Sequence, residues 1–164
     1  MREGMKSFLE EGVWKYSDAK KTIETFESEM GQLLEEAVRS QKQWSPLKNK
    51  PRIKRPSPGR GQGYGYWIRI DITGQSTTYK EVEIECGLWW DVPAYAPEID
   101  APIIYACYWS PKDVVAFSWK GQGQDIRDFE EEEGRTLLYL PLRKPQDIKG
   151  AVGRLLDALL KQLK

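Results

Sequence analysis

The chain has 164 residues, a length typical of one domain that buries a hydrophobic core of its own. Basic and acidic residues both number 25, so the formal net charge is zero and argues for neither a nucleic-acid nor a membrane partner. Histidine is absent, which excludes serine–histidine and cysteine–histidine catalysis in their usual forms and removes the commonest metal ligand.

The first predicted element is a long amphipathic helix over residues 17–41, with Ser17 as its N-cap. Its apolar stripe consists of Ala19, Ile23, Phe26, Met30, Leu33 and Ala37, and Leu34 and Val38 widen it. We favour packing of this helix on the protein's own sheet, because a wide stripe suits a globular core. The alternating spacing of three and four is also the heptad pattern, so a seam with a second chain is the alternative. Upstream, Phe8, Leu9, Val13 and Trp14 are expected to dock as a short turn or helix.

Residues 44–65 carry four prolines followed by alternating glycines, and they predict a basic linker or arm. Two strands with alternating apolar residues follow, at 66–73 and 79–86, and we expect them to form an antiparallel hairpin. In the second strand Val82, Ile84 and Cys86 point one way, and Glu81, Glu83 and Glu85 point the other way. This alternation predicts that one face of the hairpin is wet.

The rest of the chain predicts three further strands and a helix. The strands at 103–109 and 114–120 are apolar on both faces and are expected at the centre of the sheet. Residues 125–133 are expected to form a short exposed helix or a loop, and Pro141 suggests that the strand at 137–142 lies at an edge. A C-terminal helix is predicted over 145–163, with an apolar stripe of Ile148, Val152, Leu155, Leu159 and Leu163.

This order of elements predicts an α+β fold with a mostly antiparallel sheet of about five strands, flanked by a long N-terminal helix and a C-terminal helix. Residues 1–164 are expected to form a single domain, with the sheet spanning 66–142.

The compartment is inferred from the cysteines and the N-terminus. Cys86 and Cys107 belong to no CxxC pair, and we expect two free, buried thiols, with a disulfide between neighbouring strands as the alternative. Residues 1–11 lack the apolar core of a signal peptide, and no apolar run approaches the length of about 18 residues that a membrane helix needs. We expect a cytoplasmic protein that does not associate with a membrane.

Carboxylates are the remaining option for catalysis. Asp71, Glu83 and Glu85 lie on the two paired strands and could hold Mg²⁺ for phosphodiester cleavage. The nuclease pattern has an acid on one strand and Glu-x-Lys on the next, and the lysine of this pattern is missing here. We therefore favour a solvated strand face with cross-strand ion pairs, such as Arg69 to a glutamate. A metal-dependent phosphodiesterase is therefore the least favoured function, and no catalytic residue, metal or cofactor is assigned.

The favoured function is a non-catalytic protein-interaction module. In general style the chain resembles small immunity and antitoxin proteins, without sharing a motif with them. Aromatic residues that follow a strand and an acidic run are the expected contacts with a protein partner, namely Trp89, Trp90, Asp125, Asp128, Glu130 and Glu131. A homodimer through the first helix is the form of partnership that the heptad pattern suggests.

The alternative function is nucleic-acid binding. Residues 42–69 contain eight basic residues and no acidic one, and aromatic residues follow the basic arm at 48–60. Cations beside aromatic rings can contact phosphates while the rings stack on bases. The expected binding residues are Lys48, Lys50, Arg52, Lys54, Arg55, Arg60, Tyr64 and Trp67.

Overall fold

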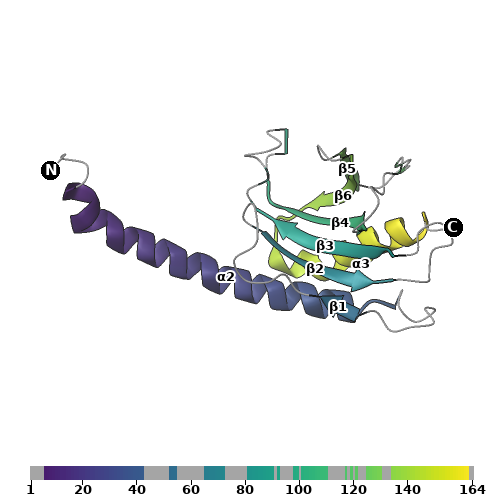
Figure 1. Ribbon diagram of the computed structural model, residues 1–164, viewed down its shortest axis with the longest axis horizontal. Coiled ribbons are helices and arrows are strands. Elements are labelled where there is room, and N and C mark those ends of the chain that lie inside the picture. The colour runs from purple at the N-terminus through teal and green to yellow at the C-terminus, as the bar shows by residue number, and fades with distance from the viewer. Residues whose placement is uncertain are drawn as a thin grey trace.

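The computed structural model describes residues 6–42, 52–54, 65–72, 81–90, 92, 98–99, 101–110, 117, 119, 121, 125–130 and 134–162. These residues form an antiparallel sheet with two helices, which confirms the predicted α+β class (Figure 1). The strands are β1 (Arg52–Lys54), β2 (Gly65–Asp71), β3 (Glu83–Trp89), β4 (Ile103–Trp109), β5 (Arg127–Glu130) and β6 (Thr136–Pro141). Within the described part of the chain their order in the sheet is β1-β2-β3-β4-β6-β5.

The predicted hairpin is formed by β2 and β3. Ile68 lies opposite Cys86 and Ile70 lies opposite Ile84, so apolar residues pair with apolar residues across the two strands. The strand predicted at 103–109 is β4, and it runs between β3 and β6, as its two apolar faces require.

Two predictions about the end of the sheet are wrong. The strand β6 is not an edge strand, because it pairs with β4 on one side and with β5 on the other. Pro141 is the last residue of β6, so its missing N–H interrupts the ladder only where the strand ends. Part of the expected helix or loop at 125–133 is the edge strand β5, whose backbone pairs with β6.

Two predicted segments lie largely outside the described residues. Of the strand predicted at 114–120, Phe117 and Trp119 are described, and neither is in a strand. Most of the linker predicted at 44–65 is also outside the described residues. Its described positions at 52–54 form the edge strand β1 rather than an extended arm.

The helices are α2 (Val13–Arg39), preceded by a π-helical turn η1 (Phe8–Gly12), and α3 (Ile148–Leu160), preceded by a 3₁₀ turn η4 (Pro145–Asp147). The predicted cap at Ser17 is wrong, because the helix already continues upstream and places Ser17 inside it. In α3 the predicted stripe is confirmed at Ile148, Val152, Leu155 and Leu159, while Leu163 is not among the described residues. No helix in the described part of the chain is both long and apolar enough to cross a membrane.

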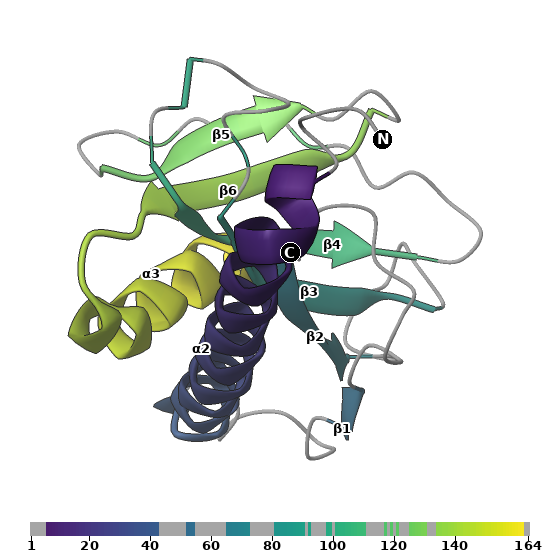
Figure 2. The same cartoon turned by 90° about the vertical axis from the view of Figure 1, so that its left-hand side faces the viewer.

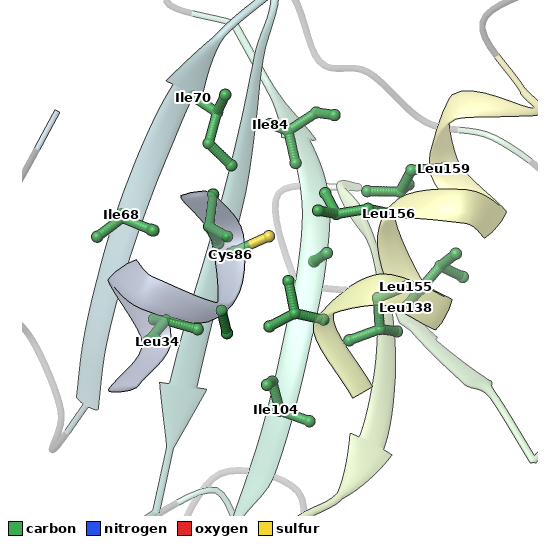
Figure 3. Close-up of a cluster of buried hydrophobic side chains, with 14 of the residues drawn as sticks. Leu34, Ile68, Ile70, Ile84, Cys86, Ile104, Leu138, Leu155, Leu156 and Leu159 are labelled. Carbon is green, nitrogen blue, oxygen red and sulfur yellow. The ribbon is translucent and has the colours of Figure 1, made fainter. Parts of the chain in front are cut away.

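One face of the sheet is covered by α3 and the C-terminal part of α2, which lie side by side (Figure 2). Figure 3 shows Leu34 from α2 and Leu155, Leu156 and Leu159 from α3 packed with Ile68, Ile70, Ile84, Cys86, Ile104 and Leu138 of the sheet. Branched aliphatic side chains on both layers give this core its close packing.

The other face of the sheet carries a second buried cluster, which consists of Val92, Ile99, Ile103, Tyr105, Cys107, Leu137 and Tyr139. Cys107 belongs to this cluster and Cys86 belongs to the first. Since Cys86 lies opposite Ala106, the two thiols point to opposite faces of the sheet. Both cysteines are free and buried, as predicted.

Candidate functional site

The helix α2 divides into a buried part and a part that projects from the folded body (Figure 1). Met30, Leu34 and Val38 are buried against the sheet and α3, whereas every residue from Val13 to Thr25 is exposed. At the junction, a Cβ on Gly31 would lie 2.8 Å from Cζ of Tyr66 on β2, so glycine allows the helix to meet the sheet there. Residues 6–29 are called the projecting segment below.

The projecting segment exposes large apolar side chains. The exposed fraction is 56% for Leu9, 72% for Trp14, 64% for Tyr16 and 40% for Ile23. The expectation that Leu9, Val13 and Trp14 dock on the body is therefore wrong. In a folded chain that also buries a full core, a row of exposed aromatic and aliphatic residues on one element is typical of an interaction surface.

The polar side of the projecting segment is stabilised by contacts within the helix. Ion pairs one turn apart join Lys6 to Glu10 at 4.0 Å, Lys15 to Glu11 at 3.5 Å and Lys20 to Glu24 at 3.8 Å. All six side chains are well exposed, so each pair contributes about 0.3–0.5 kcal/mol at most. Helices in proteins gain most of their stability from packing of an apolar face, and these pairs are a weak substitute for it.

The residues predicted to bind a protein partner lie in two separate places. Trp89 and Trp90 are half-buried at the end of β3, where Trp89 packs on the second cluster and Trp90 packs on the first. Asp125, Asp128 and Glu130 are exposed on or just before β5, and Glu131 lies outside the described residues. The strands β4 and β6 lie between β3 and β5, so the structure does not bring the tryptophans and the acidic residues together.

The prediction that the glutamate face of β3 is exposed to solvent is wrong, because Glu83 and Glu85 are both only 6% exposed. Nε of Arg69 donates a hydrogen bond to Glu85 Oε2 at 2.8 Å, and the hydroxyl of Tyr105 donates one to Glu85 Oε1 at 3.0 Å. The predicted cross-strand ion pair between Arg69 and a glutamate is therefore present, but inside the protein. The Arg69 guanidinium also lies 3.7 Å from the ring centroid of Trp109.

These contacts indicate a structural role for the Glu85 carboxylate. Burial, and then the neighbouring charge of Glu85, raises the pKa of Tyr105, so the hydroxyl keeps the proton that it donates. Within the described residues, no group of three or more cysteine, aspartate or glutamate side chains is placed to hold a metal ion.

The residues predicted to bind nucleic acid are only partly described. Arg52 and Lys54 lie on the edge strand β1, and Trp67 is half-buried against the second cluster. The remaining residues of this set, Lys48, Lys50, Arg55, Arg60 and Tyr64, lie outside the described residues.

A cleft that the sequence did not indicate lies beside the start of α3, with a volume of about 610 Å³. Arg127, Arg143 and Arg154 line it together with Asp125 and Asp147. Arg154 lies 3.7 Å from Asp125, so part of the positive charge is already balanced. Two segments of the chain contribute these side chains, 125–127 and 140–154, and the folded structure brings them together.

The chain was compared with protein-family models, with curated proteins and with solved structures, and no match was found.

Proposed function

We propose that the protein is a non-catalytic protein-interaction module that binds its partner through the projecting segment. The exposure of Tyr16 and Ile23 on a helix that projects from a packed body is the observation that supports this function. The body supplies a rigid base, because the buried end of α2 packs on both the sheet and α3. A partner that covers the apolar residues of the projecting segment would remove them from water, which is favourable by about 25 cal/mol per Å².

The charge of the projecting segment favours a protein partner over a lipid surface. Helices that lie on membranes are usually rich in lysine and arginine on their polar face. Between residues 6 and 29 the chain has four lysines, at 6, 15, 20 and 21, and six acidic residues, at 10, 11, 18, 24, 27 and 29. An acidic excess disfavours anionic lipid headgroups and does not oppose binding to an apolar protein surface.

The proposal is tested by isolating the tagged full-length chain from its native host after chemical cross-linking. The wild-type chain is expected to yield a stoichiometric complex, with either a second copy of itself or another protein. The double variant Tyr16→Glu, Ile23→Glu is expected to lose it, because the new charges would be buried in the interface.

A matched control changes the other predicted contact surface. The variant Asp128→Lys, Glu130→Lys reverses two exposed charges on β5 and leaves the projecting segment intact. Loss of the complex in this variant alone would show that the partner binds the acidic edge strand β5 and not the projecting segment. A wild-type chain that forms no protein complex at all would refute the proposed function.

Nucleic-acid binding is a second candidate, supported by the position of β1. Arg52 and Lys54 lie on a strand at the edge of the sheet, and further basic residues flank them in the sequence. Binding of a fluorescent single-stranded oligonucleotide should then weaken steeply with salt, because each phosphate contact releases counterions. Anisotropy measurements at low and high salt on the wild-type chain and on Arg52→Gln, Lys54→Gln test this candidate.

A further inference from the structure

The cleft beside the start of α3 has the size of a binding site for a small molecule. Its volume of about 610 Å³ lies within the range of roughly 300–1,000 Å³ that is usual for ligand pockets. Leu140 and Pro141 at the end of β6 line it together with Ala151 of α3, so part of its wall is apolar. Most of the other lining residues are charged, and such groups fix the orientation of a ligand.

Three arginines from different parts of the fold line this cleft. Arg127 is the first residue of β5, Arg143 follows the end of β6, and Arg154 belongs to α3. Within the described part of the chain, the only ion pair that these arginines form is the one between Arg154 and Asp125. Like charges that share a cleft repel one another, so an anion bound between the arginines would be favourable.

The two carboxylates of the cleft leave it available to an anion. Three arginines and two aspartates, Asp125 and Asp147, give the lining residues a net charge of +1. The pair between Arg154 and Asp125 is 3.7 Å long, and the two side chains are 47% and 92% exposed. An ion pair this exposed contributes little to stability. A bound anion can therefore replace Asp125 as the partner of Arg154 at little cost.

The placement of the arginines favours a phosphate group over a carboxylate as the bound anion. A carboxylate has two acceptor oxygens, and one guanidinium can bind both of them side by side. A phosphate monoester has three terminal oxygens that point in different directions, so arginines on three sides can each bind one. The apolar wall at Leu140, Pro141 and Ala151 is then available to an uncharged part of the same ligand.

From these observations we propose that the cleft binds a small phosphorylated organic molecule, whose phosphate group contacts Arg127, Arg143 and Arg154. This site uses no residue of the projecting segment. It therefore adds a ligand site to the proposed interaction module and does not depend on that function.

Titration of the purified full-length chain with phenyl phosphate, followed by NMR of the backbone amides at constant ionic strength, tests the inference. Phenyl phosphate joins a phosphate group to an apolar ring, and benzoate presents a carboxylate on the same ring. We expect saturable shifts of the Gly150 and Ala151 signals, with phenyl phosphate binding more tightly than benzoate. No saturable shift with phenyl phosphate, or saturable shifts centred on residues outside the cleft, would overturn the inference.

A charge variant and a matched control test the role of the arginines. Arg143→Gln should weaken the binding of phenyl phosphate about tenfold, because a charge-assisted hydrogen bond is lost. The control is Lys149→Gln, which removes the same charge from α3. Lys149 does not line the cleft, and it lies one turn before Gly153, which faces Gln41 of α2. Equal losses in the two variants would mean that only the general charge of this region attracts the anion.

The exchange of partners at Arg154 predicts a gain in affinity. Asp125→Asn removes the competing carboxylate from the cleft and releases Arg154. This variant should bind phenyl phosphate about two- to threefold more tightly than the wild-type chain does. Weaker binding in Asp125→Asn would contradict the placement of the phosphate group beside Arg154.

A variant that leaves the charge unchanged tests whether the ligand enters the cleft itself. Gly150 lines the cleft, and a Cβ at this position would meet nothing within 4 Å, so a longer side chain has room to extend. Gly150→Leu should fill part of the cleft and weaken the binding of phenyl phosphate at least about tenfold. Leucine also has a higher helix propensity than glycine, so α3 should stay folded, which circular dichroism checks. Unchanged affinity in Gly150→Leu would place the anion outside the cleft.

The two proposals can fail separately. The variant Tyr16→Glu, Ile23→Glu should bind phenyl phosphate like the wild-type chain, because neither residue lines the cleft. Conversely, a chain that ignores phenyl phosphate and still captures a protein partner through the projecting segment would refute the ligand site alone.

Discussion

At the scale of single residues, Tyr105 is one of two residues that stabilise the Glu85 carboxylate of β3 inside the protein. Its hydroxyl and Nε of Arg69 both donate hydrogen bonds to the buried carboxylate of Glu85. To reach that carboxylate, the Tyr105 ring crosses Gly87, the residue opposite it on β3. A Cβ on Gly87 would lie 2.4 Å from Cε1 of Tyr105, closer than side chains can approach. Glycine at this position is thus a condition for the hydrogen bond.

Replacement of Gly87 by a larger residue should therefore disrupt the hydrogen bond between Tyr105 and Glu85. We expect Gly87→Ala to lower the free energy of unfolding by about 2–4 kcal/mol, because the ring must shift and the buried carboxylate loses a donor. Urea denaturation followed by tryptophan fluorescence measures this change. The control is Gly150→Ala on α3, where a Cβ would meet nothing within 4 Å, and we expect it to stabilise the protein by about 0.5–1 kcal/mol. An unchanged midpoint for Gly87→Ala would contradict the described path of the ring.

At the scale of elements, α2 shows how tertiary contacts decide between two adjacent leucines. The spacing of apolar residues placed Leu33 on the main stripe and gave Leu34 a secondary place. In the structure Leu34 is fully buried, whereas Leu33 is 40% exposed. The helix meets the sheet and α3 at an angle that one stripe alone does not specify, so burial is centred on Met30, Leu34 and Val38.

This pair of leucines provides a test of the helix orientation. Leu34→Ala should reduce the free energy of unfolding by about 2–4 kcal/mol, because it leaves a cavity between α2 and the sheet. Leu33→Ala removes the same atoms from a position in partial contact with water and should cost less than about 1 kcal/mol. Thermal and urea unfolding of both variants measure the difference. Equal effects would mean that α2 is rotated from its described position.

At the scale of the whole molecule, the sheet separates two buried clusters. Each cluster contains a cysteine thiol or a tyrosine hydroxyl whose pKa is raised by burial. Cys86 and Tyr108 belong to the cluster beneath α2 and α3, and Tyr105 belongs to the cluster on the other face. Burial is the main cause that raises the pKa of each of these three groups above its ordinary value. The Tyr108 hydroxyl also donates a hydrogen bond to the carbonyl of Leu159 on α3, which ties the helix to β4.

These groups predict that the fold loses stability in alkaline solution. Their pKa values are higher in the folded than in the unfolded chain, so above the ordinary pKa values of 9.0 for cysteine and 10.0 for tyrosine the unfolded chain has released more protons. Stability from this source is complete below pH 9 and falls as the pH rises further. Urea denaturation at pH 7, 9, 10 and 10.5 should show this fall, with a smaller slope in Tyr108→Phe. A free energy of unfolding that does not change up to pH 10.5 would contradict the burial of these groups.

Much of the fold followed from the sequence by itself. Alternation of apolar residues predicted β2 and β3, a run that is apolar on both faces predicted β4, and apolar spacing of three and four predicted α3, because each pattern reflects local backbone geometry. The same pattern raised pairing of the first helix with a second chain as an alternative. Tyr16 was missed as a candidate contact, since the helix was expected to begin only at Ser17.

Tertiary structure decided the features that depend on what packs against an element. It buried the glutamates of β3, because the second face of the sheet carries its own core and Arg69 and Tyr105 supply partners for Glu85. It made β5, and not β6 as predicted, the edge strand, because β5 pairs with β6 through backbone hydrogen bonds that any sequence can form. It also covered only the C-terminal part of α2, because the sheet is too short to reach the projecting segment, and that length sets where the candidate interface begins.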